Sequence, residues 1–152
     1  MHKNILPLAH LESKMKVYTP IVNVAPPPTG WIKAVRLALG MSLQQLAIRL
    51  SITKQSVQEI EQREKTGSIT IKSLREVARV LDMELVYGFV PKDGSLNSLI
   101  DRRARELATR IVSRTSQSML LEDQGVSDER YEKAIEERTA QLKYAMPKIL
   151  WD

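Results

Sequence analysis

Residues 53–61 read Thr53-Lys54-Gln55-Ser56-Val57-Gln58-Glu59-Ile60-Glu61 and have the pattern of a short helix with one thin apolar face. Thr53 is a suitable N-cap, and Val57 and Ile60 are spaced to face a core. The polar side chains near the helix start point outward: Lys54, Gln55, Gln58 and Glu59. Such side chains match the donor and acceptor patterns on base edges in the major groove of DNA. The pattern therefore indicates a helix that contacts DNA.

A second short helix is predicted directly before this one. Residues 42–50 read Ser42-Leu43-Gln44-Gln45-Leu46-Ala47-Ile48-Arg49-Leu50. Ser42 with Gln45 three residues later is a capping-box pattern, and an apolar face follows it. Because only two residues separate this helix from Thr53, the helices must cross at a steep angle around the small Ala47 and Ile52. A helix, a tight turn and a helix form the geometry that lays the second helix in the major groove.

From about residue 32 to residue 82 the sequence resembles the Xre/Cro-type helix-turn-helix regulators, the family of the phage 434 and lambda repressors. The resemblance implies that Arg36 and Glu61 form an internal ion pair between the first helix and the recognition helix. It also implies that the family's first base contacts fall on Thr53 to Ser56. Two features depart from the family. Leu43 stands where a Gln commonly contacts phosphate, and residues 62–69 lack the usual Gly and Pro placement.

A set of polar residues follows from this reading as the candidate contacts to double-stranded DNA. These are Thr53, Lys54, Gln55, Ser56, Gln58, Glu59, Gln44 and Lys65. The competing interpretation of the same residues is an ordinary solvated helix face. The preceding helix and tight turn favour DNA contact. The expected function is a sequence-specific transcriptional regulator, and the family resemblance favours a repressor.

The flanking residues resemble a narrower family, mobile mystery protein A. The resemblance is carried by Gly30-Trp31-Ile32, by Leu-Val-Tyr-Gly-Phe-Val-Pro at residues 85–91, and by Met-Leu-Leu-Glu-Asp-Gln at residues 119–124. That family is typically encoded beside a Fic-domain protein, mobile mystery protein B. The resemblance therefore implies an alternative function, an antitoxin that binds and inhibits a Fic-domain toxin and autoregulates its operon.

Ser118 and Glu122 are candidate residues for binding such a partner. Inhibitory helices of Fic enzymes resemble a Ser/Thr-x-x-x-Glu arrangement, and Ser118 and Glu122 have this spacing. There the glutamate engages an arginine of the nucleotide site. The structural alternative is a helix surface next to an apolar Met-Leu-Leu contact.

The composition excludes several classes of function. The chain of 152 residues suffices for a small domain with extensions. It has no cysteine, which excludes disulfides and thiolate sites and fits a reducing cytoplasm. The two histidines, His2 and His10, lie in the N-terminal region, where a catalytic or metal-binding scaffold is not expected. No apolar run reaches the length of a membrane span. We expect a cytoplasmic protein that is not an enzyme, uses no cofactor or metal and binds no membrane.

The excess of positive over negative charge is confined to the first part of the chain. The formal net charge is +5. Residues 1–82 hold 12 Lys and Arg against 6 Asp and Glu, an excess of +6, whereas residues 83–152 hold 11 against 12, an excess of −1. A polyanion is drawn to the basic part by counterion release and long-range attraction. The remainder is suited to protein contacts.

Three regions are expected along the chain. Residues 1–29 should form an N-terminal arm with an extended Pro-rich linker, residues 30–91 the helix-turn-helix domain with its closing strand, and residues 92–152 a helical region for dimerisation or partner binding. The first helix is predicted from Trp31 to Leu39, with Trp31, Val35, Ala38 and Leu39 on its inner side, and a fourth helix from near Thr70. The fold class is mostly α, a lambda-repressor-like bundle with one short β-strand and a C-terminal helical hairpin.

The predicted strand covers Glu-Leu-Val-Tyr-Gly-Phe-Val at residues 84–90. A single strand needs a partner, which is either the β-prone residues 17–24 or the same strand of a second subunit, and the second choice makes a homodimer. In the hairpin, one helix begins after Ser95, the break lies at residues 124–126, and the other helix runs from about Ser127 to Pro147. Arginines on the first helix and glutamates on the second predict complementary faces.

Overall fold

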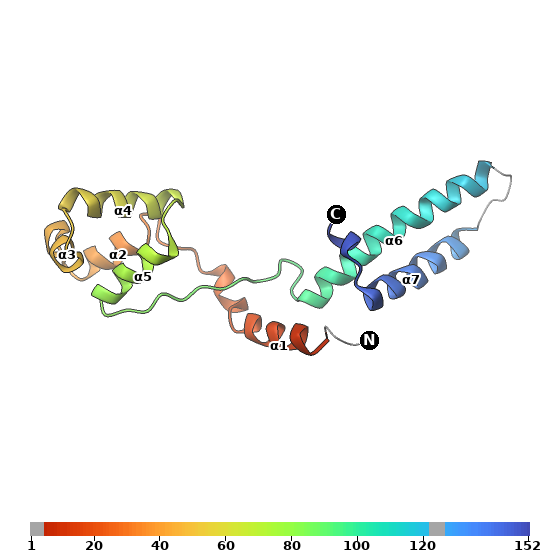
Figure 1. Cartoon of the computed structure of the whole chain (residues 1–152), viewed down its shortest axis with the longest axis horizontal. Coiled ribbons are helices and arrows are strands. Elements are labelled where there is room, and N and C mark those ends of the chain that lie inside the picture. The colour runs from red at the N-terminus through yellow and green to blue at the C-terminus, as the bar shows by residue number, and fades with distance from the viewer. Residues whose placement is uncertain (1–4, 122–126) are drawn as a thin grey trace. The chain divides into compact units, whose positions relative to one another are not determined.

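The computed structural model describes residues 5–121 and 127–152 and is mostly helical. In these residues the order of elements is α1 (Ile5–Lys16), η1 (Thr19–Asn23), α2 (Trp31–Ala38), α3 (Leu43–Leu50), α4 (Lys54–Thr66), α5 (Ile71–Val80), α6 (Leu96–Leu121), α7 (Asp128–Ala145) and η2 (Lys148–Trp151) (Figure 1). The chain divides into two compact units. One is Pro20–Gly88, and the other combines the residues up to Thr19 with Phe89–Asp152.

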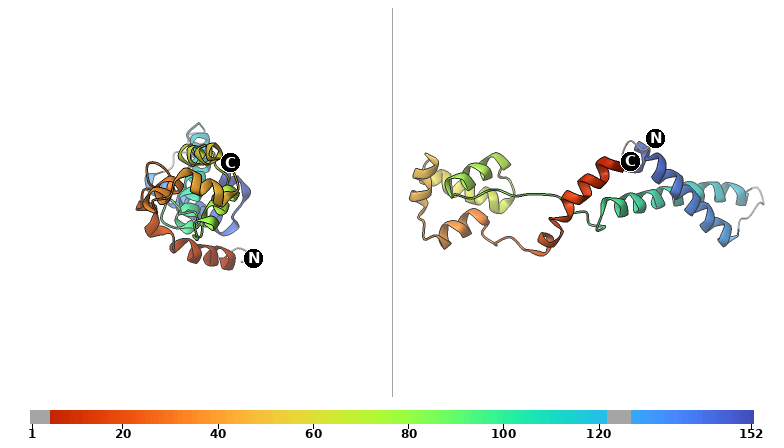
Figure 2. Two further views of the ribbon diagram at one scale, coloured as in Figure 1. Left: turned by 90° about the vertical axis from the view of Figure 1, so that its left-hand side faces the viewer. Right: turned by 90° about the horizontal axis from the view of Figure 1, so that it is seen from below.

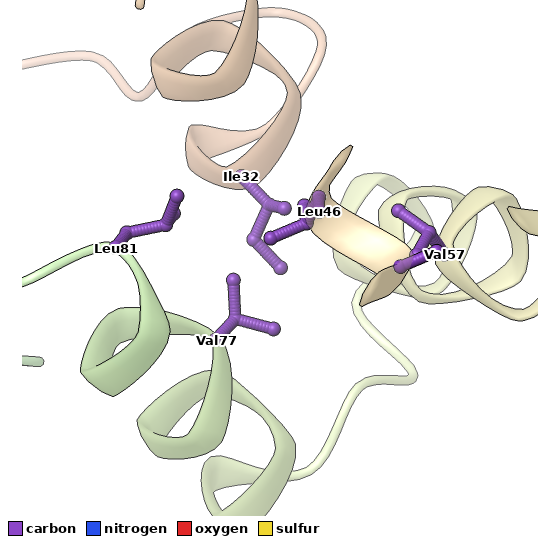
Figure 3. Packing of buried hydrophobic residues seen from close by; sticks show 6 residues of the cluster. Ile32, Leu46, Val57, Val77 and Leu81 are labelled. Atoms are coloured by element: carbon purple, nitrogen blue, oxygen red, sulfur yellow. The ribbon is translucent and has the colours of Figure 1, made fainter. Parts of the chain in front are cut away.

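The unit Pro20–Gly88 is a bundle of α2, α3, α4 and α5 around one apolar core. Its buried members are Ile32, Leu46, Ala47, Val57, Val77 and Leu81. Figure 3 shows Ile32, Leu46 and Val77 meeting between their helices, with Leu81 and Val57 on either side. Ala47 is fully buried where α3 and α4 cross, whereas Ile52 is 37% exposed and does not plug the crossing. The small side chain of Ala47 thus permits the close approach of the two helices.

The inner face of α2 differs from the predicted one. Ile32 and Arg36 are buried and Val35 is half-buried, whereas Trp31 and Leu39 are 54% and 56% exposed and Ala38 is also exposed. The prediction placed only apolar residues on the inner face of the helix and therefore left out the charged Arg36, which is buried. Arg36 can face inward because Glu61 of α4 neutralises it.

The predicted β-strand is wrong for the part of the chain that the structure describes. Residues 83–91 are extended but pair with no other segment. The expected partner within the chain, residues 17–24, contains the short helix η1 instead and offers no strand edge. An extended segment without a partner cannot form a ladder, whatever its side-chain propensity.

Within the N-terminal region predicted to be an arm, Ile5–Lys16 is the helix α1. Its sequence is rich in Leu, Lys, Glu and Met, which favour helices, and Pro7 falls in the first turn, where a missing N–H costs little. Glu12 accepts hydrogen bonds from the Asn97 backbone N–H at 2.9 Å and from Asn97 Nδ2 at 3.0 Å. Glu12 therefore ties α1 to the first turn of α6.

Helices α6 and α7 form an antiparallel hairpin and lie side by side in Figures 1 and 2. Ser113 and Tyr131 are hydrogen-bonded through their hydroxyls at 2.6 Å, and Lys143 Nζ lies 2.8 Å from Asp101 Oδ1. The core between them consists of Ala104, Leu107, Ala108, Ile135, Leu142 and, from η2, Leu150. One of the expected arginine–glutamate contacts is present, between Arg105 Nη2 and Glu132 Oε2 at 3.2 Å. The predicted break at residues 124–126 lies outside the described residues.

Candidate nucleic-acid interface

The turn between α3 and α4 is fixed by local hydrogen bonds. Ser42 Oγ accepts from the Gln45 N–H at 3.1 Å, and Gln45 Oε1 accepts from the Ser42 N–H at 2.8 Å, so the predicted capping box is present. At the other end of α3, Ser51 has the left-handed conformation with φ 57°, and the Ile52 N–H donates to Ala47 O at 3.0 Å. A left-handed residue ends a helix sharply. The chain consequently changes direction over Ser51, Ile52 and Thr53, and α4 begins at Lys54.

The start of α4 is capped by Thr53. Its Oγ1 accepts from the Ser56 N–H at 3.1 Å and lies 2.7 Å from Ser56 Oγ. These two hydroxyls hold each other, and Ser56 is half-buried. The first N–H groups of a helix and its dipole favour acceptors and negative charge in front of it. The start of α4 therefore suits contact with nucleic acid.

The other candidate residues on α4 present exposed side chains. Lys54, Gln55, Gln58 and Lys65 are exposed, as is Gln44 on α3. Glu59 is also exposed, and its Oε2 lies 3.8 Å from Arg63 Nη2 one turn later. On the opposite side of α4, Val57 and Glu61 are buried and anchor the helix. The anchored face fixes how far Lys54, Gln55 and Gln58 project.

A polar depression of about 250 Å³ brings together residues far apart in the sequence. It is lined by Thr29, Lys33, Arg36, Leu43, Gln58, Glu61, Gln62 and Lys65. Gln58 and Lys65 thus lie beside Lys33 and Gln62, which were not among the residues predicted from the sequence. The available signal was that Lys33 precedes Arg36 by one helical turn, the spacing at which two residues share one side of a helix. Two lysines at one depression create a positive site for an anionic group.

The ion pair between Arg36 and Glu61 joins α2 to α4. Arg36 Nε donates to Glu61 Oε1 at 2.6 Å, and Arg36 Nη2 donates to Glu61 Oε2 at 3.2 Å. Arg36 Nη1 also donates to Met41 O at 3.1 Å, and the two side chains are 7% and 8% exposed. Such a bidentate, buried pair has a specified geometry. It therefore sets the position of α4 against the rest of the bundle.

A second contact between the same helices involves Glu64 and was missed. Its carboxylate accepts from the Trp31 N–H at 3.0 Å and from the Ile32 N–H at 2.8 Å, and so caps the N-terminus of α2. Gly30 precedes this turn with φ 88°, and a Cβ there would lie 2.7 Å from Glu64 Oε1. Glu64 lies 32 residues after Ile32 in the sequence, so local sequence patterns cannot reveal this cap.

The proposed partner-binding pair is only half described. Ser118 is exposed on α6, and its hydroxyl donates to Arg114 O at 3.1 Å. Glu122 lies outside the described residues. Within residues 5–121 and 127–152, no group of His, Cys, Asp or Glu side chains is arranged to hold a metal ion. No helix in that same part of the chain is long and apolar enough to cross a membrane.

Comparisons with known proteins bear on one part of the chain. A family model described as helix-turn-helix matches residues 32–87, the region of α2 to α5 and the segment after α5. No curated protein matched the chain, and no solved structure did. Residues 32–87 are therefore a helix-turn-helix domain, which supports a DNA-binding regulator in general. The resemblance to mobile mystery protein A is not addressed by this match and stays a prediction.

Proposed function

We propose that this chain is a sequence-specific DNA-binding regulator that represses transcription, with α4 as its recognition helix. The observation that carries the proposal is the division of α4 into two faces. Val57 and Glu61 are buried in the bundle, while Lys54, Gln55 and Gln58 are exposed beyond the turn from α3. A major groove admits such a helix, with its N-terminal residues against base edges.

The exposed residues divide into base readers and phosphate contacts. Gln55 has an amide that can pair bidentately with adenine, and Lys54 can donate to guanine acceptors. Thr53 caps the start of α4 by accepting from the Ser56 N–H, and the exposed Glu59 lies 3.8 Å from Arg63. Lys65 and Gln44 lie at the sides of this face, where the phosphate backbone runs. Lys33 at the same depression as Lys65 extends the basic side.

The charge distribution supports the same proposal. Residues 1–82, which carry the excess of +6, contain all four helices of the helix-turn-helix domain, α2 to α5. Each lysine that contacts a phosphate releases counterions, so the logarithm of the binding constant should fall with salt concentration by nearly one per contact. Substituting Lys65 by Ala should weaken binding to all sequences alike and lower the salt slope by about one.

Repression follows if the bound domain occupies a promoter, and it is the role that the Xre/Cro resemblance implies. A reporter gene placed behind the selected binding site should lose expression when the full chain is produced. Unchanged or increased expression in that reporter would contradict repression while leaving DNA binding intact.

The experiment that tests the function itself is selection of binding sites from random double-stranded DNA by the full chain. The expected result is one enriched motif of a few base pairs per helix-turn-helix domain, bound more tightly than scrambled DNA by about 10³-fold or more. Retention of DNA without enrichment of any sequence would reduce the domain to a non-specific binder. Failure to retain DNA even in low salt would overturn the proposal.

A further inference from the structure

The extended segment after α5 has an unused backbone edge. The Met83 N–H donates to Ala78 O at 2.8 Å, and the next backbone bond along the chain is the turn in which the Gly94 N–H donates to Pro91 O at 3.1 Å. Between these two bonds, the N–H and C=O groups of residues 84–90 bond to none of the described residues. Positive φ occurs at Asp82 and Gly94 but at no residue between them. The segment therefore has a backbone ready for β-pairing along its length.

Large apolar side chains of this segment are exposed to solvent. Val86 is 66% exposed, Tyr87 55% and Phe89 83%. Tyr87 is held at the domain surface, since its ring centre lies 5.8 Å from Arg75 Cζ and its hydroxyl accepts from Arg75 Nη2 at 3.3 Å. A row of exposed apolar side chains on an unpaired edge is the usual mark of a contact surface.

The sequence of the segment is complementary to itself in the antiparallel direction. Residues 84–92 read Glu-Leu-Val-Tyr-Gly-Phe-Val-Pro-Lys, with Gly88 at the centre. When two copies pair about Gly88, Glu84 of one faces Lys92 of the other, Val86 faces Val90, and Tyr87 faces Phe89. Opposite charges, β-branched pairs and aromatic pairs are the cross-strand partners that stabilise sheets. Neither Glu84 nor Lys92 has an ion-pair partner within the described chain.

Pro91 decides the hydrogen-bonding phase of this pairing. Opposed residues alternate between pairs that exchange two backbone hydrogen bonds and pairs that exchange none. If the Gly88 pair is hydrogen-bonded, then the pair of residues 86 with 90 is also hydrogen-bonded, and the ladder ends before Lys92, which lies in the turn closed by the Gly94 N–H and Pro91 O. Pro91 then stands opposite Leu85 in a pair that needs no N–H, where proline is tolerated. The register set by the side chains and the phase set by Pro91 agree.

We propose that two copies of this chain dimerise through residues 84–92, which pair as an antiparallel two-stranded ribbon centred on Gly88. The partner is a second copy of this chain, because the segment is complementary to its own sequence in the antiparallel direction. The ribbon begins four residues after the end of α5 and therefore joins two helix-turn-helix domains. The dimer interface goes beyond the proposed function. Dimerisation is measured without DNA, so a failure of the dimer proposal would not contradict DNA binding, and a failure of DNA binding would not contradict the dimer.

Cysteine crosslinking tests the register, because the chain contains no cysteine of its own. Gly88→Cys places two thiols in one opposed pair, where the Cα atoms are about 5.5 Å apart, within the range for a disulfide. Val86→Cys is the matched control, since residue 86 faces residue 90 and is offset from its own counterpart by about 13 Å. Under mild oxidation the full chain with Gly88→Cys should become a covalent dimer, while the control should stay largely uncrosslinked. Equal crosslinking of both, or of neither, would overturn the register.

Charge exchange gives a second readout on the chain without cysteine. Glu84→Lys turns two attractive cross-strand pairs into repulsive ones and should raise the dimer dissociation constant about tenfold or more. The double variant Glu84→Lys/Lys92→Glu restores opposite charges and should return the dissociation constant to within a few-fold of the parent. Sedimentation equilibrium at micromolar concentration, with helix content checked by circular dichroism, measures these constants. A monomeric parent chain, or a dimer indifferent to the single and double variants alike, would overturn the proposal.

Discussion

The substitution Glu61→Ala probes the contact that positions the recognition helix. It removes two charge-assisted hydrogen bonds, of 2.6 and 3.2 Å, and leaves Arg36 with Met41 O as its remaining partner in the described structure. Removing one partner of a buried ion pair costs about 3–5 kcal/mol. Arg36 also borders the polar depression beside Lys33, where water can reach it, so the lower end of about 3 kcal/mol is expected. That is a large share of the stability of a small domain.

Urea denaturation of the full chain, followed by circular dichroism, measures this loss. The matched control is Glu76→Ala, which breaks an exposed pair of similar length, 3.2 Å to Arg79, and should cost under about 0.5 kcal/mol. Replacing both partners, as in Arg36→Met/Glu61→Leu, should recover much of the stability because no unpaired charge remains. If Glu61→Ala shifted the denaturation midpoint no further than Glu76→Ala does, the reasoning about the buried pair would be refuted.

Three further outcomes are expected. Glu64→Ala should lower the free energy of unfolding by about 0.5–2 kcal/mol because the cap on α2 is lost. Gly30→Ala should lower it by at least about 1 kcal/mol, because Gly30 has a positive φ and closely approaches Glu64. Denaturation curves that show no loss of stability for either variant would contradict the cap. The pKa of Asp93 lies below its ordinary value because Arg102 donates hydrogen bonds to its carboxylate. The contact therefore stabilises the folded chain at pH values above the pKa of Asp93 in the unfolded chain, and this stabilisation is lost as the pH falls through the pKa in the folded chain. An NMR titration should show a higher pKa of Asp93 in Arg102→Gln, and an unchanged pKa would exclude the contact. If the alternative antitoxin function holds, the full chain should retain a Fic-type protein in a pull-down and a chain ending near Pro91 should lose it; equal recovery by both would show that residues 92–152 do not bind it.

Local patterns in the sequence were sufficient to predict the helix-turn-helix region. Ser42, Thr53 and Thr70 begin helices as predicted, because their hydroxyls accept N–H groups only three residues away. The spacing of Val57 and Ile60 likewise identified the inner side of α4, because both residues lie within one helical turn. The packing of α6 against α7 followed from two long periodic segments separated by a short break.

Features that depend on distant residues were predicted poorly. The cap on α2 comes from Glu64, and the helix α1 is tied through Glu12 to Asn97, 85 residues away. The strand was predicted from side chains that favour β-structure, but a strand also requires a partner, and η1 occupies the segment expected to supply one. The contact of Arg36 with the distant Glu61 was predicted, but only because the sequence resembles a known family. The polarity of Arg36 alone would have predicted an exposed side chain.

The measurement that tests the central claim most directly compares the DNA specificity of Gln55→Ala with that of the parent chain. Each protein is used to select sites from the same random library, and affinities for the parent's motif and its single-base variants are then measured at one salt concentration. Gln55→Ala should lose discrimination at one position of each half-site, a change of about 1–3 kcal/mol, with the other positions unaltered. The control Gln117→Ala, an exposed glutamine on α6, should leave the motif unchanged. An identical motif from all three proteins, with Gln55→Ala binding every site as the parent does, would contradict the assignment of α4 as the recognition helix.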